Sequence, residues 1–297
     1  MMASLDRLFA RAIDFAGVFP PARQELSVAW TTYLRHLRGP EAGWVARFAC
    51  PADQLPALAQ IVEAEPPTFA VEVTVAGRAL TEYGAWQDAR VQEAEEMSIF
   101  EENAPELVTL GAYELRVADG IGFAASLRDL YQFEGLEWYA ELPWTDALED
   151  QIAAVSETEG IQAKVRTGGA TADHFPSSAH VSAFLHHCAS IDLPCKLTGG
   201  LHHPLPTLDP VTGGRMHGFV NVFGGLALTL SNDLSRAELA AILDDADPKA
   251  WSFEEKTVRW RDLSASVEFI EEARSVLVSI GSCSIDEPWS ELETLLS

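Results

Sequence analysis

Short apolar runs bounded by turn residues alternate with amphipathic helical patterns along most of the chain. This alternation favours βαβ units and a parallel sheet. Eight of the runs predict strands, and these are Ala12–Ala16, Trp44–Cys50, Phe69–Val75, Tyr113–Ala118, Leu136–Leu142, Ile161–Thr167, Pro194–Thr198 and Gly218–Phe223. The fourth strand has a competitor in Leu107–Leu110, which is equally apolar.

Helical patterns occupy the intervals between these strands. Pro51–Glu63 and Ser177–Ser190 each place apolar residues on one side and polar residues on the other. Eight strand–helix repeats within residues 1–245 match the size of a (β/α)8 TIM-type barrel, whereas a doubly wound open sheet gives the same local pattern with fewer strands. We therefore expect an α/β fold of the barrel type.

The rhythm changes after the eighth predicted strand. Ser235–Asp245 predicts a helix with a serine cap, Trp251–Arg261 a hairpin, and Ser266–Val278 a further helix. The Gly/Ser-rich turn Gly281–Pro288 leads into a short amphipathic helix. No low-complexity linker interrupts the chain, so we expect a single domain over residues 1–297, with the barrel in 1–245 and a C-terminal extension, 246–297, packed on it.

Two lysines lie within predicted strands, where cations are rare. Lys164 in the sixth strand shares a face with Arg166, because side chains alternate with a period of two, and Lys196 lies in the seventh strand. Buried cations need partners or a function. One interpretation is structural, either an internal ion pair with Glu141 or Glu72 or exposure on an edge strand. The functional interpretation is a cation cluster at the barrel mouth that attracts an anion and lowers the pKa of one lysine, which then attacks a carbonyl.

The residues around these lysines carry a family resemblance. Lys164–Thr171 reads KVRTGGAT and Lys196–Gly200 reads KLTGG, and this pair resembles the deoxyribose-phosphate aldolases, which are class I barrel lyases. The resemblance implies that Lys164 forms a Schiff base with the substrate and that Lys196 tunes it. Arg166 stands where that family has a small residue. The chain also resembles a group of bacterial proteins that share the motifs AGxFPPA, KxRTGG, GLHHP, HGFxN and GSCSxDEP.

Further polar and glycine residues follow the predicted strands, where catalytic and phosphate-binding groups of barrels lie. Glycine pairs after the last three strands predict either an anion cradle or simple turns. Glu141 and His202 are the candidates for moving protons, and Glu141 is as well suited to neutralising Lys164. The candidate substrate-binding residues are Arg166, Thr167, Gly168, Gly169, Thr198, Gly199, Gly200, His203, His217, Asn221, Gly224, Gly225, Arg47 and Asp14.

Three functions remain open from the sequence. The first is a lyase of class I aldolase type that acts on a small anionic carbonyl compound and needs no cofactor. The second is a metal-assisted hydrolase or lyase that uses His202, His217 and a carboxylate such as Glu141, although no HxH or HExxH spacing supports a metal site. The third is an anion-binding barrel without catalysis. Because barrels support many unrelated reactions, the fold alone does not decide between them.

Composition narrows the partners to small molecules. With 45 acidic and 20 basic side chains the net charge is −25, which disfavours nucleic acid and anionic membranes. The longest apolar runs fall short of the roughly 18–20 residues of a membrane span, and the first residues lack a signal-peptide pattern. Four scattered cysteines argue against disulfides. We expect a cytoplasmic protein, and the acidic surface leaves open a homo-oligomer formed through an apolar patch.

The acidic, lysine-poor composition predicts a protein adapted to a high-salt cytoplasm, because molar salt screens repulsion between surface carboxylates. We expect the melting temperature to rise from dilute buffer to molar potassium chloride, as measured by scanning calorimetry. An unchanged melting temperature across the salt series would contradict this hypothesis.

Overall fold

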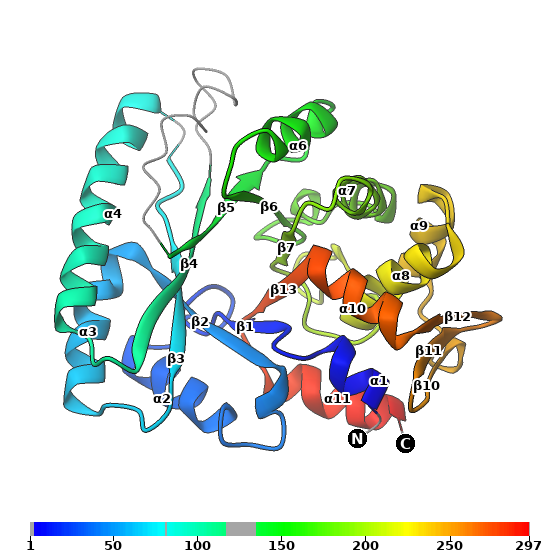
Figure 1. Cartoon of the computed structure of the whole chain (residues 1–297), viewed down its shortest axis with the longest axis horizontal. Coiled ribbons are helices and arrows are strands. Elements are labelled where there is room, and N and C mark those ends of the chain that lie inside the picture. The colour runs from blue at the N-terminus through cyan, green and yellow to red at the C-terminus, as the bar shows by residue number, and fades with distance from the viewer. Residues whose placement is uncertain (1–2, 81, 117–134, 297) are drawn as a thin grey trace.

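Eight parallel strands close into a barrel in the computed structural model, which describes residues 3–80, 82–116 and 135–296 (Figure 1). The strands follow one another around the barrel in the order β1, β13, β7, β6, β5, β4, β3, β2. Their bounds are β1 Ile13–Phe15, β2 Val45–Pro51, β3 Val71–Ala76, β4 Val108–Arg116, β5 Glu137–Leu142, β6 Ile161–Arg166, β7 Cys195–Thr198 and β13 Leu277–Ser282. The predicted (β/α)8 barrel is confirmed.

Seven of the predicted strands are present. Apart from the fourth, their ends lie within two residues of the predicted ones. The fourth strand, β4, includes both competing runs, Leu107–Leu110 from its second residue and Tyr113–Arg116, because Gly111 between them continues the strand. The last two residues of the fourth predicted strand, 117–118, lie outside the described residues.

The eighth predicted strand was wrong. Gly218–Phe223 forms the start of helix α8, Phe219–Asn232, and the barrel is closed by β13 between β1 and β7. Every residue of α8 from Phe219 to Thr229 is buried. A helix without a polar face loses the 3.6-residue signal, so its short apolar run, bounded by glycines, resembles a buried strand.

The predicted end of the barrel at residue 245 is corrected as well, because the last barrel strand, β13, lies beyond it. Helix α10, Val267–Val276, runs directly into β13 without a turn that would announce a strand. Gly281 belongs to β13, where an added Cβ would lie 3.1 Å from Thr198 Cγ2. The segment predicted as an extension therefore supplies the last barrel strand, and beyond that strand the chain ends in helix α11, Asp286–Leu296.

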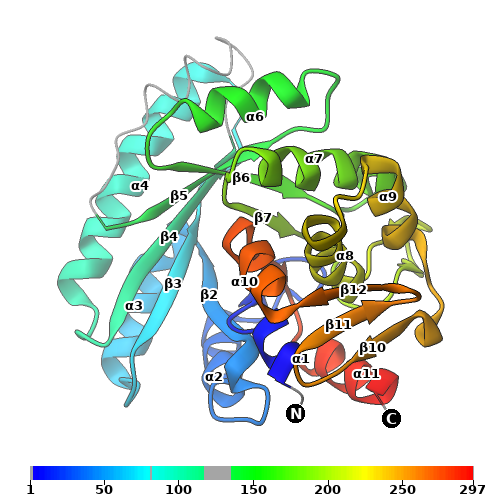
Figure 2. The same ribbon diagram turned by 45° about the vertical axis from the view of Figure 1, so that its right-hand side comes forward.

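Helices surround the barrel (Figures 1 and 2). The predicted helices after the second, sixth and eighth strands are present, and Ser235 forms a capping box with Glu238. None of the described helices is long and apolar enough to cross a membrane. The remaining bounds are α1 Ala3–Leu8, α2 Leu26–His36, α3 Leu55–Ala64, α4 Tyr83–Asn103, α6 Leu148–Ser156, α7 Ser178–Ser190 and α9 Arg236–Asp244.

A small antiparallel sheet packs against α8 through its third strand. The predicted hairpin forms its first two strands, β10 Trp251–Phe253 and β11 Thr257–Trp260, and β12 Leu263–Ser266 adds a third. A second, two-stranded sheet consists of β8 Thr207–Leu208 and β9 Arg215–Met216, both in the connection between β7 and α8. These additions leave the barrel interior to the eight parallel strands.

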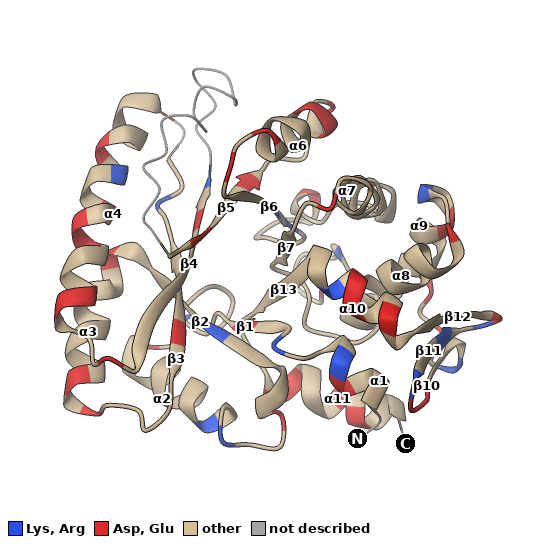
Figure 3. Ribbon diagram, in the orientation of Figure 1, with Lys and Arg blue, Asp and Glu red and all other residues tan. Residues whose placement is uncertain are grey.

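The apolar core lies between the strands and the helices. Phe15 of β1 packs on Tyr33 of α2 and on Phe48 of β2, so these side chains point out of the barrel. The side chain of Asp14, the residue before Phe15, points into the barrel, because side chains alternate along a strand. Acidic side chains are spread over the outer helices, including α3, α4 and α10 (Figure 3). Apolar side chains of β1 and β2 thus pack on the outer side of the strands, whereas Asp14 lies on the inner side.

Closure by β13 predicts a stability effect at Ile280, which is fully buried. Ile280→Ala should lower the free energy of unfolding by about 2–5 kcal/mol, through lost burial and a residual cavity. Val211→Ala is the control, because Val211 is 90% exposed, and its effect should stay within about 0.5 kcal/mol. Urea denaturation measures both. A similar small effect of the two substitutions would argue against β13 as a core strand.

Candidate active site

The two strand lysines point into the barrel. Lys164 and Lys196 are register partners on β6 and β7, and Lys196 contacts Glu114 on β4. Since β7 and β4 are not neighbours in the barrel, this contact crosses the interior. The side chain of Lys164 is 9% exposed and that of Lys196 is 0% exposed. Lys164 is therefore the lysine nearer to solvent.

Three carboxylates surround the two ammonium groups. The Nζ atom of Lys164 lies 2.7 Å from Glu114 Oε2 and 2.9 Å from Glu141 Oε2. The Nζ atom of Lys196 contacts the other oxygen of Glu114 and the carboxylate of Asp14. Glu114 thus bridges the lysines, and we call these five side chains the lysine–carboxylate cluster.

Neighbouring groups hold this cluster in place. The hydroxyl of Ser279 on β13 donates to Asp14 Oδ2 at 3.0 Å, and the backbone N–H of Arg47 donates to Asp14 Oδ1 at 3.1 Å. Lys196 Nζ lies 4.8 Å from the centroid of the Tyr139 ring, a cation–π contact. Lys196 is consequently enclosed on several sides, as its complete burial requires.

The electrostatics reverse one expectation from the sequence. Burial disfavours the ammonium form of Lys164, but the carboxylates of Glu114 and Glu141 outweigh it and raise the lysine pKa above its usual range. The pKa of Lys196 is raised in the same way, by Asp14 and Glu114. The predicted lowering of a lysine pKa by a neighbouring cation is therefore wrong. Both lysines are ammonium ions in the resting protein.

The pKa of Glu114 shifts in the opposite direction to the pKa of the two lysines. Burial alone would raise its pKa, but attraction to Lys164 and Lys196 lowers the pKa to about 2. The sequence analysis missed this residue, although it lies one residue into the fourth predicted strand. Its two-residue spacing from Arg116 places both on the same face of β4, but this local pattern does not reveal a partner on β6 or β7. The ion pair of Lys164 with Glu141 was anticipated, whereas Glu72 pairs elsewhere.

Arg47 lies at the other end of the barrel, which corrects its predicted place at the mouth. It is the third residue of β2, and its guanidinium donates to both oxygens of Glu137, the first residue of β5, at 2.8 and 2.9 Å. It also pairs with Glu72 at 3.2 Å. The amino ends of parallel strands gather at the face opposite the mouth, where barrels place stabilising residues.

Arg166 is the exposed cation closest in the chain to the cluster. It is the last residue of β6, on the same face as Lys164, and its charge helps to lower the pKa of Glu141. Thr198 occupies the corresponding last position of β7, where it is the register partner of Arg166. These two residues lie at the carboxyl ends of their strands, as predicted.

The glycines after β6 and β7 pack against one another. An added Cβ on Gly168 would lie 3.0 Å from backbone atoms of Gly200, and Gly199 and Gly200 have φ values of +80° and +73°. Thr167 is buried, and its hydroxyl donates to the Gly199 carbonyl at 2.5 Å. An added Cβ on Gly169 would clash with His174. Close packing and positive φ thus account for these glycines without a bound anion.

Three predicted binding residues belong to α8 and are corrected. The amide of Asn221 donates to the carbonyls of Ile242 and Asp245, which ties α8 to the region of α9. Gly224 makes room for Trp251, and Gly225 for Leu239 and Ile242. Their role is helix packing, and the error follows from reading this helix as a strand.

The three histidines predicted near the barrel mouth contact different parts of the structure. His217 is buried, and its Nε2 atom is hydrogen-bonded at 2.9 Å to the carbonyl of Pro176, in the connection between β6 and α7. His203 pairs with Glu291 of α11 at 2.8 Å. His202 lies beside Ser282 and Cys283 at the end of β13. Within the described residues, His202, His217 and Glu141 do not form a common group of metal ligands.

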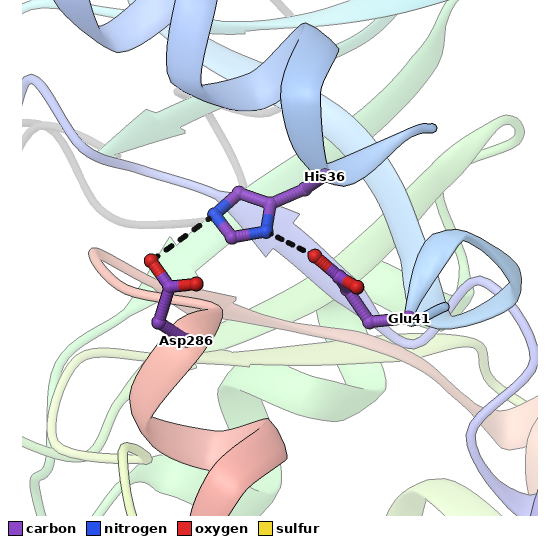
Figure 4. Close-up of side chains that lie close together, drawn as sticks. All are labelled: His36, Glu41 and Asp286. Atoms are coloured by element: carbon purple, nitrogen blue, oxygen red, sulfur yellow. Dashed lines mark hydrogen bonds and ion pairs between the residues drawn. The ribbon is translucent and has the colours of Figure 1, made fainter. Parts of the chain in front are cut away.

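Two other groups in the described chain have metal-ligand composition, namely His203 with Glu287 and Glu291, and His36 with Glu41 and Asp286. In the second group, Nδ1 of His36 is 2.6 Å from Glu41 and Nε2 is 3.6 Å from Asp286 (Figure 4). Arg35 contacts both Nε2, at 3.0 Å, and Asp286, at 2.9 Å. The chain's own guanidinium therefore supplies the cation between these two residues.

The shared carboxylate predicts how acid affects stability. Because the pKa of Glu114 is lower in the folded protein, its contribution is complete above pH 4.5 and is lost as the pH falls towards about 2. Glu114→Gln should lower the free energy of unfolding at neutral pH by about 3–5 kcal/mol, because both lysines lose a partner.

The same substitution should flatten the loss of stability between pH 4.5 and 2, as measured by urea denaturation across that range. Glu255→Gln, at an exposed position, should keep the full loss. An acid response of Glu114→Gln equal to that of the unmodified protein would show that Glu114 does not carry this charge interaction.

Comparison with known proteins does not assign the chain to a family. No family model matches the chain, and no curated protein matches it. The contacts of the barrel interior and its mouth therefore carry the functional inference.

Proposed function

We propose that the protein is an enzyme, a lyase of class I aldolase type that forms a Schiff base at Lys164 with a small anionic carbonyl compound. The observation that supports this most is the asymmetry of the two lysines. Lys164 is 9% exposed, whereas Lys196 is 0% exposed and lies between Asp14 and Glu114. Of these two lysines, Lys164 is the one nearer to solvent and suits the attack on a substrate, whereas Lys196 suits a positioning role.

The first step is the loss of a proton from Lys164. An ammonium ion is not a nucleophile, and Glu141 Oε2 lies 2.9 Å from Nζ, within reach of the proton. The free amine then attacks the carbonyl carbon to give a carbinolamine. Glu141 returns its proton to the carbinolamine hydroxyl, which leaves as water as the C=N bond forms. The bond between the α and β carbons then breaks. Its electron pair forms the enamine double bond, and the C=N π pair moves to nitrogen. Glu141 or Glu114 can take the proton of the hydroxyl group on the β carbon, which becomes the carbonyl group of the released fragment.

Lys196 influences this step through Glu114. Both lysines contact the same carboxylate, so removal of the Lys196 charge leaves Glu114 free to hold Lys164 more strongly as an ammonium ion. Lys196 thereby eases the deprotonation of Lys164 without contacting the substrate. Arg166, exposed on the same face of β6, offers the charge for the substrate's phosphate or carboxylate.

Borohydride trapping tests the proposal. We expect incubation with pyruvate, dihydroxyacetone phosphate or acetaldehyde, followed by reduction, to yield an adduct at Lys164, identified by peptide mass spectrometry. Lys164→Met should abolish it. The exposed Lys249 and Lys256 serve as internal controls, because non-specific amine reaction would label them first. No adduct at Lys164 with any of these compounds, or labelling of the exposed lysines alone, would overturn the proposal.

The pH dependence of trapping follows from the raised pKa of Lys164. The reactive amine grows as the pH rises, so the trapping rate should increase steadily from neutral to alkaline pH. Glu141→Gln removes one of the two carboxylates that stabilise the ammonium form, and should shift this rise to lower pH. Lys249→Met is the matched control and should keep the original profile. An identical profile for Glu141→Gln would exclude Glu141 as a determinant of the Lys164 charge.

A further inference from the structure

A pocket of about 310 Å³ lies beside the barrel, where the carboxyl ends of β1 and β13 meet. Its walls come from the loop after β1, from α2 and from the segment that joins β13 to α11. The lining residues are Phe15, Pro21, Ala22, Gln24, Thr32, His36, Cys283, Ser284, Ile285 and Asp286. Two motifs noted in the sequence, AGxFPPA and GSCSxDEP, thus contribute to one cavity, and none of its lining residues belongs to the lysine–carboxylate cluster.

The thiol of Cys283 lies close to the imidazole ring of His202. Cys283 is half-buried, and its Sγ atom is 3.9 Å from each ring nitrogen of His202. The hydroxyl of Ser282 donates to the Ser284 carbonyl at 2.6 Å, and its oxygen accepts from the Ser284 N–H at 3.4 Å, which leaves one lone pair for a second acceptor contact. Nδ1 of His202 lies 3.2 Å from that oxygen. The arrangement therefore favours the proton on Nδ1, which makes Nε2 the ring nitrogen that can accept a proton.

We propose that this pocket is a second reactive site, in which Cys283 is a nucleophile, His202 its general base and Ser282 the residue that orients the base. A nucleophile, a neighbouring base and a third group that fixes the base are the parts that thiol catalysis requires, and here the base lies 3.9 Å from the sulfur. The lysine chemistry uses none of these three side chains.

The ligand we assign to the site is a small uncharged aldehyde. The charged lining residues already have partners, since Asp286 pairs with Arg35 and His36 with Glu41. No lysine or arginine is among the residues that line the pocket, so it lacks the charge that a phosphate or carboxylate needs. Phe15, Ala22 and Ile285 suit a short carbon chain, and Thr32 and Gln24 offer hydrogen bonds. The volume lies at the small end of the roughly 300–1,000 Å³ of ligand pockets.

Addition of the thiol to an aldehyde needs no leaving group and no oxidant. The sulfur forms a bond to the carbonyl carbon, and the C=O π electron pair moves to the oxygen. The thiol proton passes to Nε2 of His202 and from there to that oxygen, which gives a hemithioacetal. All atoms of both reactants remain in the product, so the step is reversible and balanced.

Burial keeps both partners neutral before the reaction. Burial raises the pKa of the Cys283 thiol. Burial also lowers the pKa of His202, and the neighbouring His203 side chain adds to this lowering. The thiol is therefore activated by proton transfer during attack, and its reactivity depends on His202 being present as a base.

Alkylation of the full chain tests the dyad. With limiting iodoacetamide, peptide mass spectrometry should find Cys283 labelled first, while the buried Cys50, Cys188 and Cys195 stay unlabelled. His202→Gln should slow Cys283 labelling on the order of tenfold or more. His180→Gln is the matched control and should leave the rate unchanged, because His180 is exposed on α7 and is not among the residues that line the pocket. Melting temperatures verify that each variant is folded.

Labelling of Cys283 in folded His202→Gln at the original rate or faster would overturn the assignment, because exposure alone would then explain the reactivity. Ser282→Ala gives a second measurement if His202→Gln fails to fold. It should slow labelling by less than the loss of the base, and an unchanged rate would remove Ser282 from the proposal.

Butanal tests the ligand class. An excess should protect Cys283 from iodoacetamide, whereas pyruvate and inorganic phosphate should not. Equal protection by pyruvate would overturn the uncharged class, and no protection by butanal would overturn the aldehyde assignment. Lys164→Met separates this site from the lyase proposal: protection that persists in the variant belongs to Cys283, and protection that disappears belongs to the lysine.

Discussion

The carboxylate of Glu114 is the group on which the barrel interior depends. Burying an ammonium ion costs several kcal/mol even after the protein relaxes, and this barrel buries two. Glu114 offers one oxygen to each lysine, and Asp14 and Glu141 complete their surroundings. Because both cations rely on the same carboxylate, they are electrostatically coupled, and any change in the charge of one alters the pKa of the other.

With ion pairs inside the barrel, the apolar residues form their core in the layer between the strands and the surrounding helices. Barrels of this class commonly fill their interior with branched aliphatic side chains. Here ion pairs cross the interior at two levels, Lys196 with Glu114 and Arg47 with Glu137. The stabilising apolar contacts lie between strands and helices instead, as around Phe15 and Phe48. The inward face can therefore carry reactive groups, while stability comes from the outer layer.

Hydrophobic period and strand spacing were enough to predict the barrel, seven of its strands and the inward direction of Lys164 and Lys196. The failures have physical causes. A fully buried helix has no polar face, so α8 resembled a strand and drew Asn221, Gly224 and Gly225 into the predicted site. Strand β13 follows α10 without a turn and so gave no boundary. Glu114 was missed because partnership across the interior depends on barrel order, which local patterns do not contain.

The late strand β13 connects these observations. Its Ser279 donates to Asp14 in the lysine–carboxylate cluster, its Ile280 is fully buried, and its Ser282 contacts His202 beside the pocket. The strand docks between β1 and β7, so its contacts join opposite ends of the chain. Such long-range pairing closes a large loop and is entropically costly to form. Neither the lysine–carboxylate cluster nor the proposed Cys283 site is complete until this strand is in place, which makes barrel closure the step that assembles both.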